Sequence, residues 1–185
     1  MQNTEPLIQG WMAKEDLIVI ATLAATLGPE DSIVEVGSWM GQSTDCWAAH
    51  TQATVYAIDL WEWMPKEYEG PAKSRVNLKG DPFAQFSRFV ERHDNIVPLK
   101  RSSSGVPWEH EPPAVVFIDA MHQHPWVSDD VAFWQEIVRP GGIICGDDYS
   151  NVFPAVQGAA QRCAERFETD LVLPGNKFWM VRKPA

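Results

Sequence analysis

Short apolar runs that alternate with helical patterns constrain the fold of this chain more than any other sequence feature. The runs are rich in β-branched residues and lie at Ile33–Val36, Thr54–Leu60, Ile96–Leu99, Ala114–Ile118 and Ile143–Gly146. Apolar residues at helical spacing occupy most of the intervening segments, and the first such helix is expected at Trp11–Leu27. This alternation predicts an α/β domain with a parallel sheet and helices on both of its faces.

Acidic residues follow four of these predicted strands, each at the carboxyl end. Glu35 and Asp59 end the first two strands, Asp119 follows the fourth, and Asp147 and Asp148 follow the fifth. Ligands of parallel sheets bind beyond the carboxyl ends of the strands. The acids therefore predict a site for a polar ligand along that edge.

A turn with two glycines connects the first strand to the next helix. Gly37 and Gly41 are four positions apart and Gln42-Ser43-Thr44 follows, which predicts the first turn of a helix. Glycine lets the backbone approach a ligand, and the free N–H groups of a helix start favour an anion. The spacing differs from the dinucleotide fingerprint G-x-G-x-x-G, so we expect a carboxylate rather than a diphosphate there. Glu35 is expected to accept hydrogen bonds from the ligand.

The second strand and the segment after it add two further expectations. Asp59 lies 24 positions after Glu35, at the end of the second strand of a βαβ unit, where an acid is well placed to bind both ribose hydroxyls. The segment Trp61–Gly80 is irregular and rich in Pro and Gly. Because loops of this length are uncommon unless functional, we expect it on the acceptor side of the site.

The composition bounds the class of protein. A chain of 185 residues is expected to form a single domain over residues 1–185. The formal net charge of -10 argues against a nucleic-acid partner, which needs a basic surface. The chain has no membrane-length apolar run and no signal-peptide pattern, and its three cysteines are far apart, which favours buried free thiols. We therefore expect a cytoplasmic protein with a small-molecule acceptor.

Four segments together resemble a known family. Val34–Ser43 resembles motif I of class I S-adenosylmethionine-dependent methyltransferases. Ile118–His122 is similar to the Ile-Asp-x-x-His segment of the small O-methyltransferase branch, which includes catechol and antibiotic-sugar O-methyltransferases. Arg139–Gly142 and Gly146–Tyr149 resemble the Pro-Gly-Gly and Gly-Asp-Asp-Tyr segments of that branch.

The resemblance implies a Rossmann-like seven-stranded sheet of order 3-2-1-4-5-7-6, with strand 7 antiparallel. That strand fits the closing hairpin predicted at Leu171–Leu173 and Phe178–Val181. The implied cofactor is S-adenosyl-L-methionine: the turn after Gly37 would contact its methionine part, Asp59 its ribose, and Ser102 and Ser103 its adenine. The full expected set of cofactor contacts is Glu35, Gly37, Ser38, Trp39, Gly41, Ser43, Asp59, Leu60, Ser102, Ser103 and Asp119. A homodimer is common in such folds by resemblance.

A divalent metal is expected beside the cofactor. Asp119, Asp147 and Asp148 end strands that this topology makes neighbours, roughly 5 Å apart across the sheet. Three carboxylates at one place repel one another unless a cation or protons compensate them. Oxygen ligands without cysteine suit Mg²⁺, Mn²⁺ or Ca²⁺, and the resemblance implies the same three ligands. His122 and His124 leave open a site that needs no metal.

The predicted reaction is O-methylation of a small hydroxylated acceptor, a sugar or a phenol. His122 is the expected general base because neutral imidazole titrates near the working pH, and Asp119 is the second candidate. Aromatic side chains are expected to form the acceptor wall, namely Trp61, Trp63, Tyr68, Trp126 and Tyr149.

Two other functions fit part of the pattern. An NAD-dependent oxidoreductase shares the βαβ unit and the acid on the second strand, although the glycine spacing, the three acids and the hairpin weigh against it. A binding module would keep the cofactor pocket and lack turnover.

Overall fold

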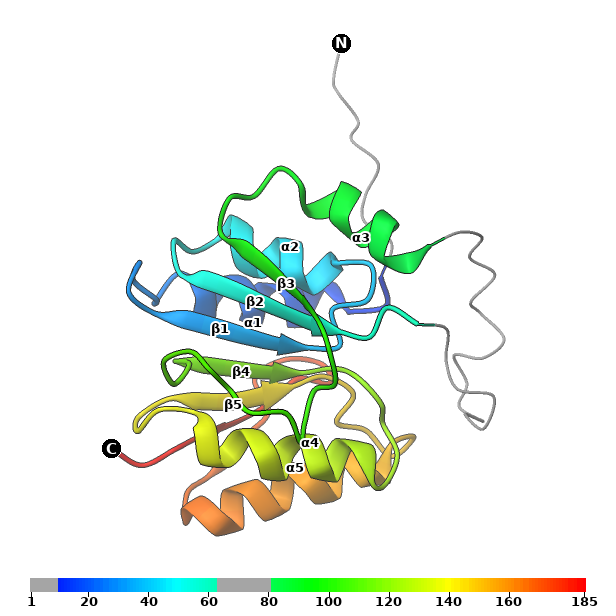
Figure 1. Cartoon of the computed structure of the whole chain (residues 1–185). Helices are drawn as coiled ribbons and strands as arrows, with labels where there is room; N and C mark the ends of the chain where they lie inside the picture. The colour runs from blue at the N-terminus through cyan, green and yellow to red at the C-terminus, as the bar shows by residue number, and fades with distance from the viewer. Residues whose placement is uncertain (1–9, 63–80) are drawn as a thin grey trace.

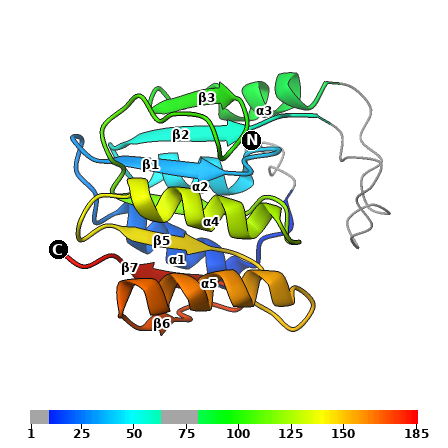
Figure 2. The same cartoon turned by 60° about the horizontal axis from the view of Figure 1, so that its bottom comes forward.

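The computed structural model describes residues 10–62 and 81–185, whose strands form one seven-stranded sheet. Its order is β3-β2-β1-β4-β5-β7-β6, with every neighbouring pair parallel except β5 with β7 and β7 with β6 (Figures 1 and 2). The bounds of the strands are β1 Ser32–Val36, β2 Thr54–Asp59, β3 Ile96–Lys100, β4 Val115–Ile118, β5 Ile143–Gly146, β6 Leu171–Val172 and β7 Trp179–Arg182. The order and the antiparallel β7 expected from the sequence are confirmed.

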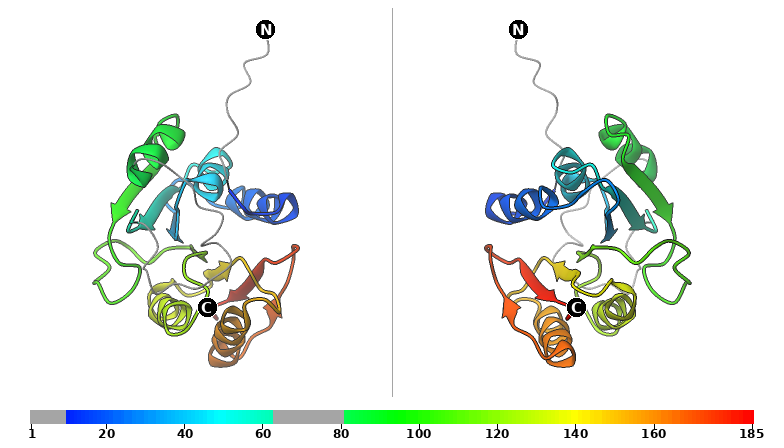
Figure 3. Two further views of the ribbon diagram at one scale, coloured as in Figure 1. Left: turned by 90° about the vertical axis from the view of Figure 1, so that its right-hand side faces the viewer. Right: turned by 90° about the vertical axis from the view of Figure 1, so that its left-hand side faces the viewer.

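The described residues form five helices, three of which cover one face of the sheet and two the other. Figure 3 shows the two layers from the ends of the sheet. They are α1 Lys14–Ala24, α2 Gln42–Ala49 and α3 Pro82–Val90 on one face, and α4 Trp126–Ile137 and α5 Pro154–Phe167 on the other. Within the described residues, no helix has the length and apolarity needed to cross a bilayer.

The period-two alternation of the central strands explains the two layers. Ile33 of β1 and Phe117 of β4 lie in the apolar cluster with α1 and α2, whereas Val34 and Val116 lie in the cluster with α4 and α5. Side chains of successive strand residues point to opposite faces, so a strand buried on both sides is apolar throughout. The apolar faces of α4 and α5 are buried against this sheet.

The first helix is shorter than expected. The pattern predicted Trp11–Leu27, whereas α1 spans Lys14–Ala24. At its start, the backbone N–H of Met12 donates to the Gln42 side chain of α2 over 3.2 Å, which takes residues 10–12 out of the helix. These residues instead line the cavity described below.

The cysteines are free thiols, as expected. Cys145 and Cys163 are buried and Cys46 is half-buried. Burial raises the pKa of the Cys163 thiol to about 12, so this thiol stays protonated at neutral pH.

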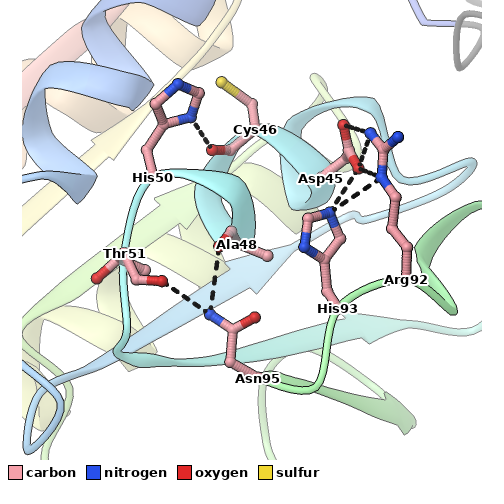
Figure 4. Close-up of polar contacts among 8 residues, drawn as sticks. All are labelled: Asp45, Cys46, Ala48, His50, Thr51, Arg92, His93 and Asn95. Atoms are coloured by element: carbon pink, nitrogen blue, oxygen red, sulfur yellow. Dashed lines mark hydrogen bonds and ion pairs between the residues drawn. The ribbon is translucent and has the colours of Figure 1, made fainter.

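A polar cluster joins α2 to the turn that follows α3, on the side of the sheet away from α4 and α5 (Figure 4). Asp45 accepts from the Arg92 guanidinium at 2.6 Å and lies 2.7 Å from Nε2 of His93. The Asn95 amide donates to the Ala53 carbonyl over 3.0 Å, and also to carbonyls at the end of α2. This cluster fixes the start of β3 beside α2.

Candidate active site at the carboxyl ends of the strands

The turn between β1 and α2 is built by two glycines in a left-handed conformation. Gly37 has φ +92° and Gly41 has φ +88°, values that side chains disfavour. A Cβ on Gly37 would lie 2.2 Å from the Asp119 carbonyl oxygen, so the backbone of β1 and β4 can approach here only with glycine. The N–H of Gly37 also donates to the Ile58 carbonyl over 2.8 Å. The turn is therefore held between β2 and β4, and Gln42 and Ser43 at the start of α2 line the cavity.

Glu35 lies beneath this turn, not on the cavity wall. Its side chain is fully buried, and its Oε2 accepts a hydrogen bond from the Thr44 hydroxyl of α2. Burial raises the pKa of this carboxyl. Oε2 thus joins β1 to α2, whereas Oε1 has no hydrogen-bond partner among the described residues. Direct contact between Glu35 and a ligand stays a prediction.

Asp59 lies at the end of β2, on the cavity wall. Its Oδ2 accepts from the N–H of Trp39 at 2.8 Å and its Oδ1 accepts from the N–H of Trp61 at 2.6 Å. Burial raises its pKa, and these backbone hydrogen bonds act in the opposite direction. A carboxylate has about four acceptor positions, so capacity remains for ligand hydroxyls. Leu60 beside it is half exposed and also lines the cavity.

A serine loop after β3 forms the adjoining wall. Ser103 donates to the carboxylate of Asp130 on α4, and its carbonyl accepts from the Trp134 indole over 3.0 Å. Ser102 donates to the Ser104 carbonyl over 3.0 Å. Asp130 is buried, which raises its pKa, and it was absent from the sequence prediction. It lies on the face of α4 that also buries Val127, Val131 and Trp134, so an acid at a core-facing helical spacing was the sequence signal that could have identified it.

Asp119, His122 and Asp148 converge at one end of the cavity. Nε2 of His122 lies 3.3 Å from Asp119 Oδ1 and 3.1 Å from Asp148 Oδ2. Burial lowers the pKa of His122, but the hydrogen bond and charge of Asp119 and the charges of Asp148 and Asp147 outweigh it and raise the pKa above its ordinary value. Asp148 adopts φ +62°, a sparsely populated conformation for a residue with a side chain.

Lys177 is the residue of this cluster that the sequence prediction missed. Its ammonium group donates to Asp148 Oδ1 and lies 3.9 Å from Asp147 Oδ2. β7 pairs antiparallel with β5, with Gly146 opposite Trp179, so the residue two positions before Trp179 lies at the carboxyl end of β5. The predicted antiparallel strand therefore contained the signal that places Lys177 here.

Asp147 differs from its two neighbouring acids. It is buried, and its Oδ1 has no hydrogen-bond partner among the described residues. Burial, followed by the charge of Asp119, raises its pKa to about 7. A buried oxygen without a partner costs free energy unless a ligand or a proton compensates it.

The donor set fits a divalent ion. One ligand atom each from Asp119, His122 and Asp148 lies within 4.8 Å of the other two. This group contains His122 in the place of Asp147, the third ligand expected from the sequence. Carboxylate oxygens suit Mg²⁺, Mn²⁺ or Ca²⁺. The three predicted acids all line the cavity at this end, and Asp148 already forms an ion pair with Lys177.

Aromatic residues expected at the acceptor wall have different positions. Trp126 is 42% exposed and lines the cavity. Trp61 is buried against Phe83 and Phe86, so its expected role in the wall is wrong. Tyr149 packs against the apolar core and is absent from the cavity lining. Trp63, Tyr68 and the rest of the expected loop from 63 to 80 lie outside the described residues.

A segment before α1 supplies an aromatic pair instead. Trp11 stacks on Trp39 with ring centroids 4.3 Å apart and an interplanar angle of 19°. Both rings line the cavity, together with Gly10 and Met12. The sequence pattern assigned Trp11 to a helix and so gave no indication of this contact.

These elements surround one cavity of about 750 Å³. Its wall contains Gly37, Ser38, Trp39, Gly41, Ser43, Asp59, Leu60, Ser102, Ser103, Asp119, His122, Asp147, Asp148 and Lys177. The structure thus brings together the expected cofactor, metal and base residues, with Glu35 beneath them. The volume is in the range of small-molecule and cofactor sites.

Comparisons with known proteins agree with this geometry. The family model described as "Methyltransferase domain" matches residues 34–149, whereas no curated protein matches the sequence. The solved O-methyltransferase NovP is 17% identical, with a TM-score of 0.71, and the alignment covers 92% of this chain and 80% of that chain.

Other solved structures extend the likeness. An rRNA methylase from Streptococcus thermophilus is 14% identical with a TM-score of 0.67, covering 95% of this chain and 100% of that one. SMU.1697c, a methyltransferase-like protein from Streptococcus mutans solved in complex with SAH, is 12% identical with a TM-score of 0.65, covering 94% and 99%. At these identities the likeness shows a shared fold. The family match covers most of the chain, and with the strand order observed here it shows that this protein belongs to the class I S-adenosylmethionine-dependent methyltransferases.

Proposed function

We propose that this methyltransferase transfers a methyl group from S-adenosylmethionine to a hydroxyl oxygen of a small acceptor, a sugar or a phenol. The observation that carries the proposal is the position of His122. Its ring lies on the cavity wall between two carboxylates, with Nε2 at 3.3 Å from Asp119 and 3.1 Å from Asp148. An imidazole held in this way can accept the proton that a hydroxyl loses on methylation.

The cofactor is assigned to the walls nearest the glycine turn. The turn at Gly37–Gly41 would contact its methionine part, and Ser43 at the first turn of α2 would lie near the carboxylate. Asp59 would accept from the ribose hydroxyls. Ser102 and Ser103 would contact the adenine, with Ser103 fixed by its bond to Asp130.

The mechanism is an in-line displacement at a methyl group attached to a sulfonium. The protein aligns the acceptor oxygen with the methyl carbon, and such positioning lowers the barrier without a covalent intermediate. His122 takes the hydroxyl proton as the oxygen attacks. The two carboxylates stabilise the imidazolium that forms and hold the ring in place, whereas Asp119 is the alternative base.

The raised pKa of His122 sets the direction of the pH dependence. A base must begin the reaction unprotonated, so the rate increases with pH through the raised pKa of this group. The carboxylates that raise the pKa also make the neutral ring a stronger base once it has lost its proton.

A divalent ion is part of the proposal. Asp119 and Asp148 would hold it, with His122 or Asp147 nearby. Such an ion, when bound, would lower the pKa of the acceptor hydroxyl and fix its direction.

A small acceptor fits the charge of the molecule better than a nucleic acid. Although two structural neighbours are titled as rRNA methylases, the net charge of -10 here opposes contact with a phosphate backbone. Many of the polar residues of the cavity wall are acidic as well. We therefore propose a small-molecule acceptor without nucleic-acid or membrane partners, in a cytoplasmic protein that can form a homodimer.

Two measurements test the proposal. Thermal-shift titration should show stabilisation by S-adenosylhomocysteine and none by NAD, and stabilisation by NAD alone would remove the methyltransferase assignment of this site. Methyl transfer is then measured over a panel of sugars, phenols and amines, with and without Mg²⁺. Transfer to hydroxyl compounds supports the proposal, whereas transfer confined to amines, or full cofactor affinity without any transfer, would overturn it.

A further inference from the structure

The cavity carries its own cation at the place assigned to the metal. Lys177 donates to Oδ1 of Asp148, while Oδ2 of the same carboxylate lies 3.1 Å from His122. Asp147 lies 3.9 Å from the same ammonium group. Both oxygens of a proposed metal ligand are therefore already paired with cationic or hydrogen-bonding groups.

The backbone around Lys177 is fixed from two sides. Its carbonyl accepts from the Tyr149 N–H over 2.9 Å, next to Asp148. On the other side, the N–H groups of Asn176 and Lys177 donate to the buried carboxylate of Asp16, at 2.7 Å and 3.3 Å. These contacts hold the residue beside β5, so only the flexible four-carbon side chain can carry the ammonium group into or out of the cluster.

Charge explains why a lysine in this position matters. Asp119, Asp147 and Asp148 would repel one another in a partly buried site, and an ammonium group lowers that repulsion. A divalent ion would lower it too, but it needs the same oxygens and repels the ammonium group at close range. Lysine and metal are thus alternative partners of the same carboxylates.

We infer that Lys177 is an internal competitor of the divalent ion, which must displace the Lys177 ammonium group from Asp148 in order to bind. The inference rests on the metal site of the proposed function and gives Lys177 a positioning role in it. In the ion-free protein Lys177 keeps Asp148 in place. When an ion binds, the side chain swings away while the backbone stays.

Replacement of the charge tests this directly. Binding of Mn²⁺ is measured by isothermal titration calorimetry on the full chain without acceptor or cofactor. Lys177→Met keeps the length of the side chain and removes its charge, so the dissociation constant for Mn²⁺ should fall by at least roughly ten-fold. Lys14→Met, an exposed lysine on α1, is the matched control and should leave the constant unchanged. Asp148→Asn should weaken binding.

A second readout uses the unmodified protein. Amine labelling followed by peptide mass spectrometry reports how accessible each lysine is. Addition of Mn²⁺ should increase labelling of Lys177 several-fold and leave Lys14 unchanged. If Lys177→Met does not fold, this result decides alone: an increase supports the inference, and constant labelling overturns it.

The outcomes separate this inference from the proposed function. An unchanged Mn²⁺ affinity in Lys177→Met, or no Mn²⁺ binding by either form, would overturn the competition. The first result leaves the proposed function intact, whereas the second also removes the divalent ion from it. Methyl transfer is measured separately with the acceptor panel.

Discussion

Two clusters in this molecule contain the same kinds of group, an aspartate, a histidine and a long basic side chain. One joins Asp45 to Arg92 and His93 between α2 and the end of α3 (Figure 4). The other joins Asp148 to His122 and Lys177 at the cavity. Residue types alone do not distinguish them.

The two clusters differ in their balance of acidic and basic groups and in whether they line a cavity. At the first cluster one carboxylate meets two basic groups away from the main cavity. At the second, Asp119 and Asp147 add two further acids, the groups line a cavity of about 750 Å³, and Asp147 Oδ1 has no partner among the described residues. A surplus of buried negative charge beside open volume is what a cationic cofactor or metal requires. We therefore regard the first cluster as a structural clamp and the second as the reactive site.

The largest expected difference is in catalysis. His122→Ala should lower kcat by about 10²–10⁴-fold, the usual contribution of a general base. The matched variant His93→Ala should keep kcat within about three-fold of the wild-type value, because it removes only a contact of the structural clamp, away from the cavity. Steady-state kinetics with the best acceptor of the panel measures both. Equal losses in the two variants would erase the distinction between the clusters.

The next difference is in the pH dependence of stability. Asp147 has its pKa raised from 3.8 to about 7 in the folded protein, so the folded state binds its proton more tightly than the unfolded state does. Its contribution is fully present below about pH 4 and is lost as the pH rises to about 7, a change of about 4 kcal/mol. Asp147→Asn should remove much of this slope.

Urea unfolding of the ligand-free protein at pH 5 and pH 7.5 measures that slope. Glu30→Gln, which removes an exposed carboxylate outside both clusters, serves as the control and should change the slope less than Asp147→Asn does. If Asp147→Asn also keeps it, the buried acid does not carry the cost that the cavity geometry assigns to it.

The smallest effect is expected at the clamp. Arg92 is about half exposed, and ion pairs of this kind contribute at most about 1 kcal/mol. Arg92→Met should therefore lower the free energy of unfolding by at most about 1 kcal/mol and leave the affinity for S-adenosylhomocysteine unchanged. Denaturant unfolding and calorimetry measure the two quantities. A clear loss of cofactor affinity would show that the clamp belongs to the site.

Much of the fold was predictable because its signal is local. Alternating strands and helices, with an apolar pattern on each strand, fix the layers, and a parallel sheet brings the acids at the strand ends to one edge. Asp59, Asp119 and Asp147 indeed line the same cavity. The glycine turn was visible in the same way, since Gly37 and Gly41 both adopt the conformation that favours glycine.

The rest depends on contacts between distant segments. Glu35 is buried because Thr44 lies above it, and Trp61 is buried because Phe83 and Phe86 pack on it. Trp11 leaves the expected helix to stack on Trp39. The spacing of apolar residues along the chain gives no information about contacts between distant residues. The sequence therefore identified the edge of the sheet that holds the site, but not every side chain on the cavity wall.

The cofactor and the acceptor are proposed to meet at His122, and a crystal structure with S-adenosylhomocysteine and Mg²⁺ is the sharpest test of that meeting point. We expect the homocysteine part along Gly37–Gly41, the ribose at Asp59 and the sulfur facing the open volume beside His122. A nucleoside bound elsewhere, or a sulfur directed away from His122, would contradict it.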